Sequence, residues 1–100
     1  MTITKKNENG IITLELEGQL DSVTSPQLEE EVNAIEEATA IIFDFALVEY
    51  ISSAGLRQVL FANKKAKNLG ARFSVINAGA QAMSIFHLTG VEKKLDIKSK

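Results

Sequence analysis

The sequence predicts an α/β fold: a small, mixed but mostly parallel sheet of four to five strands, with helices packed on it. Three observations predict this fold. The pair Asn9-Gly10 separates two segments of alternating polarity, which is typical of a β-hairpin. A nearly continuous apolar run follows at residues 40–45, which is typical of an inner strand. Amphipathic segments flank that run, and alternation of strands with helices implies parallel pairs joined by right-handed crossovers.

The first half of the chain is expected to hold the hairpin and one helix. The two hairpin strands are predicted near Thr2–Lys6 and Ile11–Glu17, and the apolar side chains of the second strand alternate, so one of its faces is buried. Residues Gly18–Ser25 are interpreted as a loop. A helix is predicted over Pro26–Glu37, because a proline suits the first helical position and apolar residues recur at helical spacing.

The second half is expected to alternate strands and helices. The run Ala40–Phe45 predicts a central strand covered on both faces, with Asp44 at or near its end. In the helix that follows, Leu56, Val59 and Leu60 are expected to form an apolar stripe that continues through Ala66. The predicted elements after the central strand are a helix from Ala54 to Gly70, a strand over Ala71–Asn77, a short helix within Ala78–Gly90 and a last strand around Leu95–Ile97.

The composition narrows the class of protein. A chain of 100 residues with 45% hydrophobic residues is expected to form one domain, residues 1–100. A net charge of −2, with no basic excess, argues against binding of nucleic acid. The N-terminus lacks a signal-peptide pattern, and no apolar stretch approaches the ~20 residues that cross a bilayer. These features predict a cytoplasmic protein with no membrane insertion.

The sequence offers little for catalysis. Cysteine is absent, which removes disulfides, thiolate chemistry and cysteine metal sites. The single histidine, His87, stands alone and is interpreted as structural or solvated. No nucleophile elbow and no glycine-rich phosphate loop occur, and the pairs Glu29–Glu30 and Glu36–Glu37 belong to a solvated helix. We therefore expect no enzyme activity, no cofactor and no metal site.

The segment Glu49–Arg57, EYISSAGLR, joins the central strand to the next helix and carries two adjacent serines. One interpretation is structural: Ser52 or Ser53 caps the helix by accepting a hydrogen bond from an unpaired backbone N–H. The other is functional, because ligand and partner sites gather at the carboxyl ends of strands in open α/β sheets. A helix N-terminus also favours an added phosphate, and Gly55 is expected to leave one side of the turn bare for an approaching molecule.

These serines lie within a resemblance that covers nearly the whole chain. The sequence from Ile11 to about Ile97 resembles a STAS domain of the anti-sigma factor antagonist type, most specifically over IIFDFALVEYISSAGLRQVL. The family pattern has an aspartate, an aromatic–aliphatic pair and then Asp-Ser-(Ser/Thr/Ala)-Gly-Leu. It matches Asp44, Tyr50-Ile51 and Ser52–Leu56 here. Ser52 stands where the family usually has an aspartate.

The resemblance implies a phosphorylation-controlled partner switch. The phosphorylated serine of the family falls on Ser53, and Asp21 matches an acidic position close to it. The unmodified protein would bind an anti-sigma factor kinase of the histidine-kinase-like ATPase type. That partner would phosphorylate Ser53, which places charge near Asp21 and Asp44, and a metal-dependent serine phosphatase would reverse the step. The implied partner-binding residues are Asp21, Ser52, Ser53, Ala54, Gly55, Leu56 and Arg57.

Two other functions compete with the switch. The first is a STAS subunit that acts as an unphosphorylated scaffold in a transport or sensory complex, where Ser52 and Ser53 only cap a helix. The second is an enzyme, which the missing acid–base constellation argues against.

Overall fold

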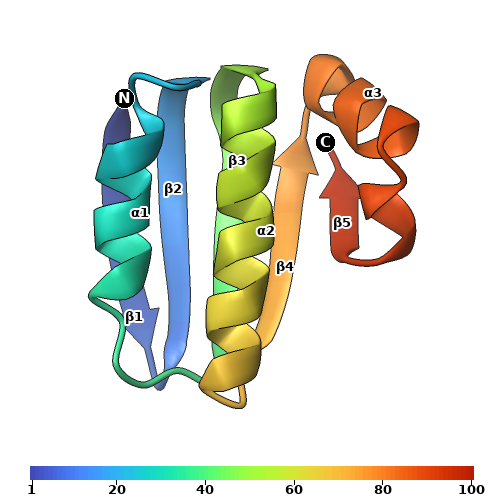
Figure 1. Ribbon diagram of the computed structural model, residues 1–100. Coiled ribbons are helices and arrows are strands. Elements are labelled where there is room, and N and C mark those ends of the chain that lie inside the picture. The colour runs from blue at the N-terminus through green and yellow to red at the C-terminus, as the bar shows by residue number, and fades with distance from the viewer.

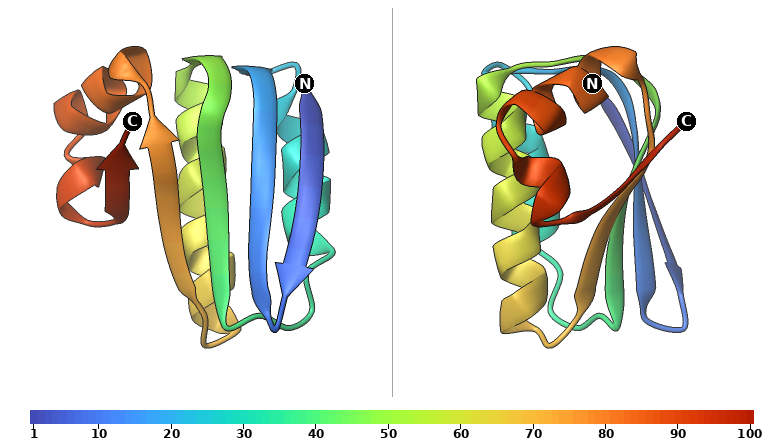
Figure 2. Two further views of the ribbon diagram at one scale, coloured as in Figure 1. Left: turned by 180° about the vertical axis from the view of Figure 1, so that it is seen from behind. Right: turned by 90° about the vertical axis from the view of Figure 1, so that its right-hand side faces the viewer.

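The computed structural model describes residues 1–100 and consists of a five-stranded sheet with three α-helices on one of its faces (Figures 1 and 2). The strands lie in sequence order, with β1 antiparallel to β2 and every other neighbouring pair parallel. The predicted fold class is therefore confirmed. The strands are β1 (Thr2–Glu8), β2 (Ile11–Leu20), β3 (Ala40–Ile51), β4 (Arg72–Ala78) and β5 (Asp96–Ser99). The helices are α1 (Ser25–Asn33), α2 (Ser53–Asn68), α3 (Ala80–Leu88) and the 3₁₀ helix η1 (Val91–Lys93).

The predicted hairpin joins β1 and β2. Asn9 and Gly10 have φ values of 54° and 87°, as a turn with two left-handed residues requires. The strand β2 runs three residues beyond the predicted end at Glu17, because Leu20 is fully buried and still pairs with Ile51 of β3. The loop between β2 and α1 is therefore shorter than the predicted loop, Gly18–Ser25.

The central strand β3 departs from the prediction in two ways. It continues six residues past Phe45 and ends at Ile51, so Asp44 lies near its middle instead of its end. Only one face of the strand is covered: Ile41 and Phe43 are fully buried, whereas Ile42 and Asp44 are half-buried on the opposite face. The view from behind shows that no helix covers this second face (Figure 2). The prediction that both faces of this strand are covered, which was drawn from the continuous apolar run, is therefore wrong.

The helix α1 begins near the predicted residue but ends at Asn33, four residues before the predicted end. Ile35 remains in the core although it follows the helix. Thr24 occupies the N-cap position without a side-chain capping bond. The helical spacing of apolar residues therefore predicted burial correctly but not the C-terminal end of the helix.

The helix α2 runs close to its predicted bounds and is followed by Gly70 at φ +71°. Its buried stripe consists of Val59, Ala62 and Ala66, whereas the predicted Leu60 is 41% exposed. Side chains of the helices and of the covered sheet face form one apolar cluster, in which Phe43 and Phe73 meet edge to face at 5.1 Å. No helix is both long and apolar enough to cross a membrane.

Candidate functional site

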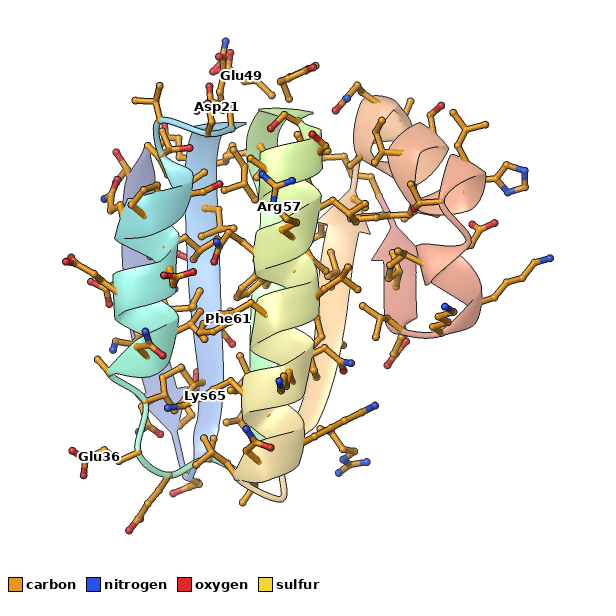
Figure 3. All side chains as sticks on the ribbon, in the orientation of Figure 1. Asp21, Glu36, Glu49, Arg57, Phe61 and Lys65 are labelled. Atoms are coloured by element: carbon orange, nitrogen blue, oxygen red, sulfur yellow. The ribbon has the colours of Figure 1, made fainter.

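The candidate site lies at the edge of the sheet where the parallel strands β2 and β3 end. Leu20 pairs with Ile51, and the backbone N–H of Ser52 donates to the carbonyl of Leu20 at 3.0 Å. The loop that begins at Asp21 and the turn that enters α2 are consequently neighbours. Figure 3 shows Asp21 and Glu49 at this end of the sheet and Arg57 on the first turns of α2. The fold therefore brings the two predicted segments of the site together.

Ser52 and Ser53 differ in role. Ser52 is the N-cap of α2, with an extended backbone, and its hydroxyl accepts a hydrogen bond from the N–H of Gly55 at 3.4 Å. Its own carbonyl accepts from Leu56 N at 2.9 Å. Ser53 is the first residue of the helix and is exposed. Of the two capping candidates, the structure thus selects Ser52, and Ser53 is exposed at the helix N-terminus.

Gly55 does not leave the turn open, contrary to the prediction. It is buried, and a Cβ atom at this position would lie 2.5 Å from the carbonyl oxygen of Leu20 and 2.7 Å from Cγ1 of Ile51. A real Cβ cannot approach so closely, so the glycine allows α2 to pack directly on the ends of β2 and β3. The residue is needed for contact within the chain, and it presents no bare surface to another molecule.

Asp21 organises the loop between β2 and α1. Its Oδ1 accepts hydrogen bonds from the backbone N–H groups of Val23 at 2.9 Å and Thr24 at 3.1 Å. The loop carries Val23 with 83% of its surface exposed. A single exposed apolar side chain is common on protein surfaces, so Val23 by itself does not mark an interface.

The other predicted residues divide between the surface and the interior. Arg57 is exposed, Leu56 is half-buried against the core, and Ala54 is buried. Asp44, expected near the phosphate, lies seven residues before Ile51 on the uncovered sheet face, roughly 20 Å along the strand. There it accepts a hydrogen bond from Nδ2 of Asn77 at 3.0 Å. Asp44 is therefore remote from Ser53.

Sequence reasoning missed Gln81, a residue of α3 that touches the site. Its Oε1 accepts from the N–H of Ile51 at 2.9 Å, and its Nε2 donates to the carbonyl of Ile51 at 2.9 Å. No motif marks this glutamine, because the bond pairs residues 30 positions apart. The exposed apolar side chains near the end of β3, Leu47 and Tyr50, were also missed, because the apolar run continues through Val48 and no polar alternation marks an exposed face there.

The chain brings together no group of three or more histidine, cysteine, aspartate or glutamate side chains that could hold a metal ion. His87 is exposed on α3, where its Nδ1 contacts Oε1 of Glu92. The groups at the candidate site are hydroxyls, the Asp21 carboxylate that its own loop engages, the exposed carboxylate of Glu49 and the exposed guanidinium of Arg57. This set suits recognition by a protein surface and presents an accessible hydroxyl.

The class of protein follows from the sheet order, the helices on one face and the serine turn. The family model for the STAS domain matches residues 2–100, and the chain belongs to this family. The resemblance noted in the sequence is confirmed.

Known relatives agree with that assignment. The anti-sigma-F factor antagonist RsfB of Mycobacterium tuberculosis (strain H37Rv) is 30% identical over 95 residues, which cover 93% of this chain and 77% of that protein. The crystal structure of an anti-sigma factor antagonist from Mycobacterium paratuberculosis is 26% identical, with a TM-score of 0.88 over 99% of this chain and 86% of that one. The phosphorylated form of the Bacillus cell fate determinant SpoIIAA has a TM-score of 0.77 at 16% identity, over 99% of this chain and 93% of that one, a likeness of fold.

Proposed function

We propose that this protein is an anti-sigma factor antagonist whose binding to an anti-sigma factor is controlled by phosphorylation of Ser53. The observation that carries the proposal is the position of Ser53. It is the exposed first residue of α2, at the edge where β2 and β3 end. The names of the curated relatives support the antagonist role, and the phosphorylated form of SpoIIAA gives a precedent for a modified protein of this fold.

The first step of the proposed switch is docking of the unphosphorylated protein. The partner is an anti-sigma factor kinase of the histidine-kinase-like ATPase type, and it covers the edge that carries Ser53, Arg57 and the Asp21 loop. The exposed Val23 and Tyr50 supply apolar area at the same edge. Bound there, the kinase reaches the hydroxyl of Ser53 with its own ATP. A serine phosphatase later removes the phosphate and restores binding.

The phosphate acts differently in the free protein and in the complex. It adds a charge of about −1.5 to −2 at neutral pH. In the free protein, water and the N–H groups at the start of α2 stabilise that charge. In the complex the phosphate loses its water next to the loop that begins at Asp21, and the desolvation and the negative charge of Asp21 both oppose binding. A loss of about 3 kcal/mol corresponds to a drop of more than a hundredfold in affinity.

A kinase assay tests the proposal. The purified protein is incubated with the candidate anti-sigma kinase and ATP, and its intact mass is measured over time. We expect one phosphate on the wild type and on Ser52→Ala, and none on Ser53→Ala. Phosphorylation of Ser53→Ala to the same extent would place the acceptor elsewhere. An unmodified wild type that still binds the kinase would favour the constitutive scaffold.

A further inference from the structure

The outer half of β3 has lost its strand neighbour on one side. Pairing between β3 and β4 ends at Asp44 and Ile76. Beyond this point Asn77 adopts φ 58°, and β4 bends away with a register shift. The side chain of Asn77 then bonds to Asp44 at the branch point. The part of β3 that leads to the serine turn therefore pairs with β2 alone.

Gln81 takes the place of the missing strand at the last residue of β3. A neighbouring strand bonds to a residue through one acceptor and one donor, and a glutamine side chain offers the same two groups in one plane. The two bonds to Ile51, both 2.9 Å, have the lengths of normal backbone hydrogen bonds. Gln81 lies in the first turn of α3 and is half-buried, so the fold holds its backbone in place.

Ile51 is thereby fixed from both sides directly before the serines. Leu20 pairs with it from β2, Gln81 bonds to it from α3, and its side chain is fully buried. The next residue, Ser52, caps α2, and Ser53 begins the helix. Any rotation of the chain at Ile51 would redirect the hydroxyl of Ser53 relative to a docked partner. The bonds to Gln81 oppose that rotation.

We propose that Gln81 is the positioning residue for the phosphate acceptor: it holds Ile51 so that Ser53 meets the partner kinase in a fixed orientation. The inference rests on the proposed function for the phosphorylation step, but the hold on Ile51 stands on the geometry alone. It also links α3 to the serine turn, two segments that are distant in the sequence.

The hold on Ile51 is tested by amide exchange and by the ¹H–¹⁵N spectrum. Gln81→Leu keeps the approximate size of the side chain and removes both hydrogen bonds, and Met83→Leu on the same helix serves as the matched control. We expect protection of the Ile51 amide to fall at least tenfold in Gln81→Leu and to stay within twofold in Met83→Leu. Unchanged protection of Ile51 in a folded Gln81→Leu variant would overturn the proposal.

Gln81→Glu separates the hydrogen bonds from the packing of the side chain. A protonated carboxyl group accepts and donates as an amide does, whereas the carboxylate only accepts and faces the carbonyl of Ile51. The Ile51 amide resonance of Gln81→Glu should therefore move towards its wild-type position as the pH is lowered from 7.5. The same resonance in wild type and Gln81→Leu should not follow that titration. A pH-independent Ile51 resonance in Gln81→Glu would also contradict the proposal.

The kinase assay then tests the link to the acceptor. In Gln81→Leu we expect kcat for phosphorylation to fall about tenfold, with KM and the affinity of the unphosphorylated protein within twofold of wild type. A wild-type kcat together with a released Ile51 would refute the positioning role. If the wild type itself is never phosphorylated, the proposed function fails, and the amide measurements still decide whether Gln81 holds Ile51.

Discussion

The inner and outer halves of β3 are built differently. The inner half, Ala40–Asp44, has β2 on one side and β4 on the other, and its backbone bonds are those of a regular parallel sheet. The outer half, Ala46–Ile51, keeps only β2 as a strand neighbour. On the other side, side chains reach its backbone: Asp44 accepts from Ala46 N, Nζ of Lys100 donates to Ala46 O, and Gln81 bonds to Ile51.

The inner half of β3 therefore contributes mainly to the fold, and the outer half contributes mainly to the candidate site. The inner half is held by a repeating backbone pattern and by apolar packing, which many sequences could provide. On the side away from β2, the outer half depends on single side chains at single positions. It also carries exposed Leu47 and Tyr50 and leads directly into the serine turn. Substitutions in the two halves should therefore differ in kind as well as in size.

The largest expected effect is on the inner half. Phe43→Ala removes a fully buried ring that meets Phe73 edge to face, and it should lower the free energy of unfolding by about 3–5 kcal/mol. Tyr50→Ala, in the outer half, should lower it by about 1 kcal/mol or less, because the residue is 46% exposed. Urea unfolding of both variants measures the difference. Equal losses would mean that the outer half also belongs to the core.

The second-largest effect is expected for Gly55→Ala. This variant should lose about 2–3 kcal/mol in free energy of unfolding, because the new methyl group would overlap the carbonyl of Leu20. The intrinsic helix propensity of alanine, about 1 kcal/mol better than that of glycine, acts in the opposite direction. Gly79→Ala is the matched control, since a Cβ there meets nothing within 4 Å. Thermal unfolding compares the two variants, and a Gly55→Ala protein as stable as wild type would rule out the close approach of α2 to β2.

The alanine variants of the two serines should differ by about 1 kcal/mol in free energy of unfolding. Ser52→Ala removes the N-cap bond to Gly55 N and should cost about 1 kcal/mol, towards the lower end of the usual range because the bond is long at 3.4 Å. Ser53→Ala, at an exposed position, should leave the free energy of unfolding unchanged within about 0.5 kcal/mol. Denaturant melts of the two single variants measure both values. A larger loss for Ser53→Ala than for Ser52→Ala would reverse the assignment of the cap.

The smallest expected effect is an increase in stability. Gln58 is buried, and its Oε1 accepts no hydrogen bond from another group of the chain, while Nε2 donates to Oε1 of Glu29 at 3.3 Å. An unsatisfied buried acceptor is costly, so Gln58→Leu should raise the free energy of unfolding by about 0.5–1 kcal/mol. The exposed Gln27→Leu, on α1, should change it little. A destabilised Gln58→Leu would indicate that the amide has a partner, such as an ordered water.

The sequence was sufficient to predict the parts of the fold that depend on neighbouring residues in the chain. The Asn9-Gly10 turn, the alternation in β2 and the apolar spacing in α2 each depend on local chemistry, and each predicted its element. Continuous apolar residues did not reveal that one face of β3 is uncovered, because Ile42 places an apolar side chain on the uncovered face and so hides the alternation expected of such a strand. The end of α1 was also missed, because Ile35 is buried without being helical.

The site was less predictable than the fold for a physical reason. The serine turn could be located from its own residues and from the family resemblance, and the fold does bring the Asp21 loop to it. The contacts that shape the turn join residues far apart in the chain, such as Gly55 with Leu20 and Gln81 with Ile51. Local patterns carry no information about such contacts, so the buried position of Gly55 and the role of Gln81 emerged only from the structure.

The central claim is that a phosphate on Ser53 controls partner binding at this edge of the sheet. Titration calorimetry of the anti-sigma partner against the unmodified protein and the purified Ser53 phosphoform tests it most directly. We expect the phosphoform to remain folded and to bind more than a hundredfold more weakly, with Ser53→Asp also weakened and Ser53→Ala close to wild type. Equal affinities for the unmodified and phosphorylated proteins would contradict the switch.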